Sequence, residues 1–427
     1  MLSPRNVRSN LSPSRRRFLK YSAAVAAGTV GAPLVHSKSK TTLRVLGTHV
    51  TLQEPLRQQA QKDLGIDIVF QPNGSASVLQ QAATRPESFD LYEQWSNSIN
   101  VLWDAGAIQP IEKARINHWD EINSLTKIGR LTPDAKLGQG DAPYKLLNVQ
   151  ANGLLGAEPS DLASFLPYVH NVDSFAYNSQ VIAPGVPYET ESWGWLLDPQ
   201  YKGKVGIINE PSIGIFDLAL AAQARGLVDF NDIGAMSRAE IDTLFDVLIS
   251  LKMDGHFGGF WNSVPQSVQF MSSGRVVIGS MFSPGVSALN GQGIPTIYAA
   301  PREGYRGWHG VMCLSSNTQG RVRDAAYDYM NWWLSGEPGA FIARQGYYIS
   351  NPGRSRPHLS DAEWNYWYEG EPASTDLRGT DGNISVHAGE FRSGGSYETR
   401  FSNIAVWNTV MPNYEYSLQR WYGLLTA

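Results

Sequence analysis

The 427-residue chain has a formal net charge of −4, is 42% hydrophobic and 17% charged, and contains one cysteine. Six of its 35 basic residues and no acidic residue lie within residues 1–37, so the remainder carries 29 basic against 39 acidic residues. This acidity argues against a nucleic-acid partner or an anionic membrane surface, and the lone Cys313 excludes an intrachain disulfide. The length exceeds the roughly 250–300 residues at which one core stops growing, which predicts two domains.

The first residues of the chain match the pattern of an export signal. Residues Ser14 to Lys20 read Ser-Arg-Arg-Arg-Phe-Leu-Lys and match the twin-arginine consensus Ser/Thr-Arg-Arg-x-Phe-Leu-Lys. The following stretch, Tyr21 to Val35, is only mildly apolar, as is typical of this class of leader. We therefore predict a twin-arginine (Tat) signal peptide over residues 1–37, cleaved after Ser37. The Tat export machinery would be a partner of the precursor, and the mature protein would be periplasmic.

Strand and helix patterns alternate after the leader. Apolar runs predict strands at residues 43–46, 66–70, 89–92, 173–177, 203–208, 275–282 and 311–314. Periodic segments predict helices at residues 53–64, 75–84, 98–105, 215–225, 237–251, 321–334 and 338–345, with a long aromatic-rich helix closing the tail over 403–425. Residues 107–165 show no clear period. The alternation predicts an α/β fold with mixed, mostly parallel sheets covered by helices on both faces.

Catalytic and metal-binding signatures are missing from the sequence. There is no Gly-x-Ser-x-Gly elbow, no phosphate-binding glycine loop with lysine and no Cys-x-x-Cys-His motif. The eight histidines are scattered, none within four residues of another, so no local metal-ligand pair exists. These observations favour a protein that is not an enzyme and has no cofactor.

A family resemblance rests on several segments. Residues 192–205 read Ser-Trp-Gly-Trp-Leu-Leu-Asp-Pro-Gln-Tyr-Lys-Gly-Lys-Val. They resemble the Ser-Trp-x-x-Leu-x-x-Pro-x-Tyr-Lys-Gly signature of bacterial solute-binding proteins of the spermidine/putrescine type. Residues 167–178 and 303–317 are similar to the family's two crossings between lobes, and residues 345–352 to its Gly-Tyr turn. The order and spacing agree over residues 42–425.

The resemblance implies a two-lobed periplasmic-binding fold of type II that captures a small molecule between its lobes. Lobe 1 would comprise residues 42–170 plus 309–350, and lobe 2 residues 171–308 plus 351–427. The partners implied are a small-molecule ligand and the membrane permease of an ABC importer, with no nucleic acid, and the protein is expected to be a monomer.

The matched family positions also imply a ligand site. Family members hold ammonium groups with carboxylates and aromatic faces. The positions that match ligand contacts are Trp95, Asn97, His170, Asp173, Glu210, Phe282, Trp308 and Trp407. Two acidic anchors of a polyamine site are missing, because only Glu210 is kept before the helix and Gly310 stands where another acid is expected. We therefore expect a small polar organic ligand, either a polyamine-like amine or a zwitterion.

Two alternatives stay open. A ferric-ion or metal-complex binder on the same fold could use Tyr347, Tyr348, His49 and His170 with carboxylates, because hard oxygen ligands suit ferric iron. A Tat-exported enzyme with a bound cofactor is the other, since that route carries proteins that fold before export.

Overall fold

The computed structural model describes residues 40–140 and 142–427. The twin-arginine motif and the predicted cleavage site lie outside these residues, so the signal peptide stays a prediction. None of the helices in the described part is long and apolar enough to cross a membrane.

The first part of the described chain forms alternating strands and helices close to the predicted positions. Its elements are β1 (Thr42–Gly47), α1 (Glu54–Leu64), β2 (Asp67–Pro72), α2 (Ser75–Thr84), β3 (Leu91–Trp95) and α3 (Ile99–Asp104). β1 pairs in parallel with both β2 and β3. α1 ends as predicted because Gly65 adopts a left-handed conformation with φ 66° and donates its N–H to Gln61 O.

Residues 107–165 contain elements too short to produce a readable period. They are β4 (Ile108–Gln109), β5 (Ile111–Glu112), α4 (Ser124–Ile128), β6 (Asn148–Val149), β7 (Leu155–Gly156) and β8 (Leu162–Ala163). β5, β8, β6 and β7 form a small antiparallel sheet in that order. Two-residue strands carry no alternation, which explains why the sequence did not reveal them.

A second group of strands and helices follows. Its elements are β10 (Val205–Ile208), α5 (Pro211–Ala224), α6 (Arg238–Met253), β11 (Phe257–Trp261), α7 (Val264–Ser272), β12 (Ile278–Met281), α8 (Ser283–Gly291) and β13 (Thr296–Tyr298). β10 lies between β11 and β12 and is parallel to both. α6 begins with a capping box in which Ser237 and Glu240 bond each other's backbone N–H, so its start was readable from the sequence.

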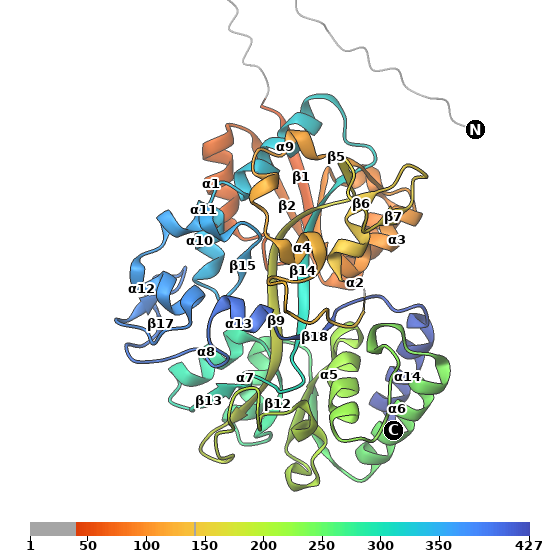
Figure 1. The fold of residues 1–427 in the computed structure, drawn as a ribbon, viewed down its shortest axis with the longest axis vertical. Helices are drawn as coiled ribbons and strands as arrows, with labels where there is room; N and C mark the ends of the chain where they lie inside the picture. Colours follow the sequence, from red (N-terminus) through yellow and green to blue (C-terminus); the bar gives the residue numbers. More distant parts are fainter. Residues whose placement is uncertain (1–39, 141) are drawn as a thin grey trace, which may run out of the picture. The chain divides into compact units, whose positions relative to one another are not determined.

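Two long strands join these groups. β9 (Leu166–Asn178) and β14 (Tyr305–Ser315) run side by side through the middle of the molecule (Figure 1). They occupy the centre of a sheet with the order β11-β10-β12-β9-β14-β3-β1-β2. The sheet is parallel in its outer parts and antiparallel at β12-β9, β9-β14 and β14-β3. The sheet is mixed, as predicted, because strands that cross between the groups in opposite directions pair antiparallel.

The rest of the chain returns to both groups. Its elements are α9 (Gly320–Trp333), α10 (Glu337–Ala343), β15 (Tyr348–Ile349), α11 (Pro352–Ser355), α12 (Asp361–Trp364), β16 (Leu377–Arg378), β17 (Ile384–Val386), α13 (Tyr397–Phe401), β18 (Ile404–Trp407) and α14 (Tyr414–Thr426). The closing helix begins later than residue 403, since Ile404 to Trp407 pair in parallel with β14.

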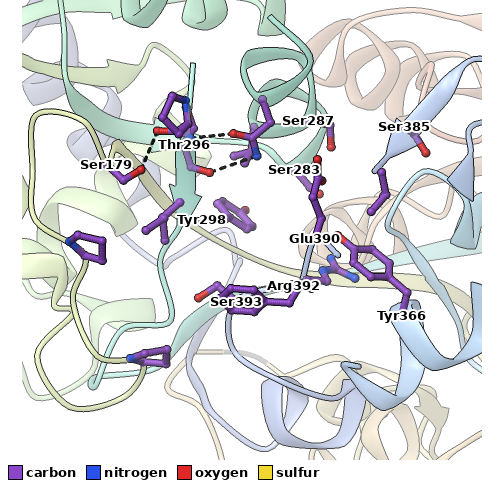
Figure 2. Close-up of a pocket in the computed structure, with 18 of the residues that line it drawn as sticks. Ser179, Ser283, Ser287, Thr296, Tyr298, Tyr366, Ser385, Glu390, Arg392 and Ser393 are labelled. Carbon is purple, nitrogen blue, oxygen red and sulfur yellow. Dashed lines mark hydrogen bonds between the residues drawn. The ribbon is translucent and has the colours of Figure 1, made fainter. Parts of the chain in front are cut away.

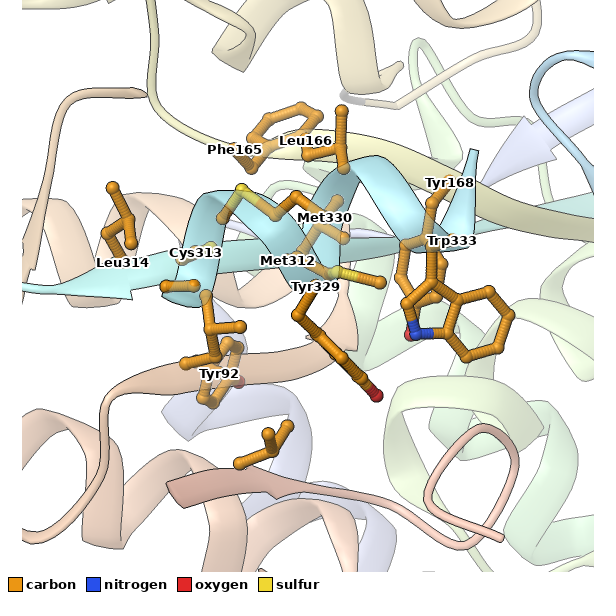
Figure 3. Close-up of a cluster of buried hydrophobic side chains, with 14 of the residues drawn as sticks. Tyr92, Phe165, Leu166, Tyr168, Met312, Cys313, Leu314, Tyr329, Met330 and Trp333 are labelled. Atoms are coloured by element: carbon orange, nitrogen blue, oxygen red, sulfur yellow. The ribbon is translucent and has the colours of Figure 1, made fainter. Parts of the chain in front are cut away.

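Three main clusters of buried apolar side chains fill the described chain. One surrounds β1, β3 and α9 and includes Tyr92, Cys313 and Trp333 (Figure 3). A second surrounds β10, α5 and α6. A third is formed largely by side chains from residues 359–407, which pack with Tyr348 on β15. Cys313 is fully buried, and this burial raises the pKa of its thiol, so it behaves as a small apolar residue.

Candidate functional site

A cavity of about 240 Å³ lies beside the crossing strands, where the end of β3 meets β9, β14 and the N-termini of α5 and α8. Five of the eight predicted ligand residues line it, although they come from distant parts of the chain. They are Trp95, Asp173, Glu210, Phe282 and Trp308. The crossing strands explain this convergence, because β9 and β14 place Asp173 and Trp308 on one face of the sheet.

The other three predicted residues do not line this cavity. His170 is fully buried on the opposite face of β9, where its Nε2 lies 2.8 Å from Tyr397 Oη. Trp407 is 1% exposed and packs in the third apolar cluster. Asn97 lies in the 3-10 turn Ser96–Ser98 that follows β3, and it does not border the cavity.

Aromatic rings form one wall of the cavity. The rings of Trp95 and Trp308 meet edge to face at 4.7 Å, and Trp308 meets Tyr347 in the same way at 5.7 Å. Trp95 Nε1 donates to Ser75 Oγ at 3.3 Å, which fixes the indole. Phe282 lines the cavity from the residue that precedes α8. Such a wall offers apolar contact and a cation–π surface.

A buried arginine stands between two carboxylates at the base of the cavity. Arg306 is 1% exposed and donates from Nε to Asp217 Oδ1 at 2.7 Å and from Nη2 to Asp173 Oδ2 at 3.4 Å. Its Nη1 donates to Asn408 Oδ1 at 3.2 Å. Burial raises the pKa of Asp173, and the Arg306 charge opposes that shift. Asp173 therefore has a partner in the protein and does not act as a free anchor for a cation.

Glu210 is the carboxylate with the fewest ties to the protein. It is the N-cap residue of α5, but its side chain makes no capping hydrogen bond, and among the described residues it accepts only from Ser212 Oγ at 2.9 Å. The Glu210 side chain therefore does not cap α5 and is placed to contact the cavity contents.

Asn171 was missed as a site residue. It is 1% exposed, lines the cavity, and neither its Oδ1 nor its Nδ2 has a hydrogen-bond partner among the described residues. A buried amide without partners is costly unless a ligand or water supplies them. Strand alternation could have found it, because Asn171 and Asp173 share a face of β9 whereas His170 cannot.

Three helices point uncapped N-termini at the cavity. α2, α5 and α8 contribute Ser75, Ser212 and Ser283 to the lining, and none of the three has a side-chain cap. By contrast, α7 is capped by Ser263 Oγ. The positive ends of these helix dipoles attract negative charge, although Pro211 and Pro284 each remove one first-turn N–H from α5 and α8. The cavity therefore combines an aromatic wall and a carboxylate with groups that favour an anion.

The residues named for a ferric site are dispersed. Tyr347 lines the cavity, but Tyr348 donates its hydroxyl to Trp367 O inside the third cluster, and His49 lines a separate depression. Among the residues that the structure describes, no three His, Cys, Asp or Glu side chains are grouped to hold a metal ion.

Comparison with known proteins decides the family. The family model of the bacterial extracellular solute-binding proteins matches residues 56–367. The chain belongs to this family. Its members bind solutes and are not enzymes, as the sequence predicted. None of the curated protein sequences compared with the chain matched it.

Solved structures with the same fold are similar to almost the whole chain. A spermidine/putrescine substrate-binding protein from Streptococcus pneumoniae is 13% identical, with a TM-score of 0.61, over 91% of this chain and 98% of its own. A lipoprotein of Treponema pallidum is 11% identical, with a TM-score of 0.62, over 90% and 99%. A binding protein from A. tumefaciens R10, solved with agropinic acid, is 13% identical, with a TM-score of 0.53, over 91% of this chain and 99% of its own. These matches confirm the two-lobed periplasmic-binding fold.

Proposed function

We propose that the protein captures a small zwitterion or amine in the cavity beside Asn171 and delivers it to the membrane permease of an ABC importer. The observation that carries this proposal is the buried Asn171 amide, whose two polar atoms have no partner in the described chain yet border an aromatic cavity. A ligand that hydrogen-bonds there would satisfy both atoms.

The charges of the cavity favour a zwitterion over a polyamine. An ammonium group would lie against the Trp95–Trp308 wall and pair with Glu210, since Asp173 is engaged by Arg306. A carboxylate would meet the uncapped N-termini of α2 and α8. A volume of about 240 Å³ suits a small molecule, because pockets for drug-sized ligands span roughly 300–1,000 Å³.

Hinge closure of two lobes would complete the site. The proposed lobes are residues 42–170 plus 309–350 and residues 171–308 plus 351–427. Two of the apolar clusters lie on either side of the crossing strands and support this division. The third cluster joins side chains between Leu359 and Phe401 to Val172 and Tyr305 on the crossing strands and to Ala340, Ala343 and Tyr348, so this part of the chain packs against the crossings and against residues of the proposed lobe 1. Ligand contacts from both lobes would stabilise the closed form.

The proposal includes export by the Tat route to the periplasm and action as a monomer. The twin-arginine motif in residues 14–20 supports the route.

The ligand class is tested by calorimetry with spermidine, putrescine, glycine betaine and a panel of amino acids. We expect a zwitterion to bind at least tenfold more tightly than spermidine, because each desolvated ammonium group needs its own acceptor. Trp308→Ala should weaken the tightest ligand, whereas Trp103→Ala, on α3 and outside the cavity, should not. Nanomolar spermidine binding that survives Glu210→Gln would overturn the proposed class. Native mass spectrometry of protein purified from its own periplasm would then name the ligand.

A further inference from the structure

A second, larger cavity of about 660 Å³ lies on the other side of α8, between β13 and the segment around residue 392 (Figure 2). None of the residues predicted as ligand contacts lines it. Its wall includes Ser283, Tyr298, Tyr366, Arg392 and Ser393. Figure 2 shows the side chain of Arg392 between Tyr298 on one side and Tyr366 on the other.

Arg392 is a buried cation without an acidic partner. Arg392 is 8% exposed, and no carboxylate among the described residues forms an ion pair with it. Nη1 donates to Tyr348 Oη and Nη2 to Gly346 O, the latter at 3.3 Å. The guanidinium carbon lies 5.3 Å from the Tyr348 ring centroid and 5.2 Å from that of Trp367. A guanidinium has five N–H donors, so Nε and one hydrogen on each terminal nitrogen remain.

A second buried arginine increases the local positive charge. Arg400 is 1% exposed, lies over the Tyr305 ring at 5.5 Å, and none of its three guanidinium nitrogens has an aligned hydrogen-bond partner. Burial and the neighbouring Arg400 charge lower the pKa of Arg392. Arg400 does not line the cavity, but its charge acts on Arg392, and two desolvated cations without a counter-ion among the described residues favour an anion beside the one that borders the cavity.

Two acidic side chains line the same cavity and limit what it can hold. Glu191 is 1% exposed and both of its oxygens are occupied, Oε1 by the Tyr177 hydroxyl and Oε2 by the Ala300 N–H. Glu390 is half-buried, and no hydrogen bond or ion pair of its carboxylate is present in the described chain. Its negative charge would repel an anion with two charges more than an anion with one.

We propose that this cavity is a second ligand site, which binds a small organic monocarboxylate on Arg392. The free N–H groups of Arg392 would hold the two carboxylate oxygens, as the fork geometry of guanidinium allows. The hydroxyls of Ser283 and Ser393 are further donors, and the rings of Tyr298 and Tyr366 receive the apolar body. Ser283 lines both cavities, so the two sites share one wall.

Benzoate is the probe, compared with chloride, acetate and inorganic phosphate at equal ionic strength. Benzoate should raise the Tm of the purified mature protein in a concentration-dependent way, since it binds the folded state only. Arg392→Gln should weaken benzoate binding by about ten- to hundredfold. Arg356→Gln, an exposed arginine in the same part of the chain, is the matched control and should leave binding unchanged. Trp308→Ala should also leave it unchanged, which separates this site from the first.

A variant that binds benzoate more tightly tests the site without the doubt that a loss of binding comes from misfolding. Glu390→Gln removes the repelling carboxylate without breaking any side-chain contact in the described chain, so it should tighten benzoate binding by about threefold or more and admit phosphate better. Benzoate that shifts the Tm no more than chloride does would overturn the proposal. So would benzoate binding that survives Arg392→Gln, that is lost in Trp308→Ala, or that Glu390→Gln leaves unchanged.

Discussion

Replacement of Asn171 by leucine separates a ligand contact from a structural residue. Leucine has the branched shape of asparagine and the same number of side-chain heavy atoms, is somewhat larger, and has no polar atoms, while the Asn171 side chain borders a cavity and has no hydrogen bonds to lose within the described chain. Leaving a buried polar group without partners costs about 1–3 kcal/mol, so its removal should stabilise the ligand-free protein or leave it unchanged. The same change should remove one or two hydrogen bonds to the ligand.

The expected loss of affinity follows from those bonds. About 1–3 kcal/mol corresponds to a roughly five- to 150-fold higher Kd. Calorimetric titration of the tightest zwitterion of the panel measures this loss, and scanning calorimetry of the ligand-free variant measures its Tm. We expect an unchanged or higher Tm together with weaker binding.

Asn351→Leu is the matched control. Asn351 is also 1% exposed, but it lies outside the cavity and its Nδ2 donates to Leu334 O at 2.8 Å. This variant should lower the Tm and leave the affinity unchanged. If Asn171→Leu instead lowered the Tm and left binding intact, Asn171 would be a structural residue and the proposed site would lose its main support.

Three further predictions concern export, motion and pH. Replacing Arg15 and Arg16 by lysine should leave precursor in the cytoplasm, as fractionation and blotting would show; normal periplasmic accumulation would disprove the Tat route. The ligand-loaded protein should have a smaller radius of gyration by small-angle scattering than the stripped protein, and identical profiles at saturation would argue against hinge closure. Burial lowers the pKa of His170, and it lowers the pKa of His309 to about 3. The unfolded chain therefore takes up protons below about pH 6.5 that the folded chain does not, and stability falls as pH drops from about 6.5 toward 3. His309→Gln should reduce that loss by about 1.4 kcal/mol per pH unit in denaturant titrations, and an unaltered pH slope would show that His309 is not responsible.

Most helices and strands could be predicted because the residues that begin and end them stand where the structure has the element boundaries. α6 has its capping box at Ser237, and α1 has its terminal Gly65. Residues 107–165 could not be assigned because two-residue strands owe their form to pairing with distant partners, as Glu112 pairs with Leu162. The first residues of β9 and β14 were missed for a similar reason. Both strands are buried on both faces, so they lack the alternation that marks a half-exposed strand.

Residues of the cavity wall were predicted where one side chain at a family position sufficed, and were overlooked where the role of a residue depends on its neighbours in space. Trp95, Phe282 and Trp308 are aromatic at family positions, and the structure brings all three to one cavity. Arg306 was overlooked because its role depends on Asp217, which lies on α5 and has no signal in the sequence near β14. His170 and Asp173 were placed together although an odd separation on a strand puts their side chains on opposite faces.

Arg306 pairs with the two aspartates at the base of the cavity, and this pairing limits which charged ligand the cavity would accept. Asp173 on β9 and Asp217 on α5 would suggest a site for several ammonium groups, but the Arg306 guanidinium bonds Asp217 at 2.7 Å and Asp173 at 3.4 Å. The cavity is therefore left with Glu210 as the carboxylate free to pair with a ligand cation. The uncapped N-termini of α2 and α8 add positive potential on the same lining. The positive potential would repel the ammonium groups of a polyamine, which carries no negative group. It would attract the carboxylate of a zwitterion.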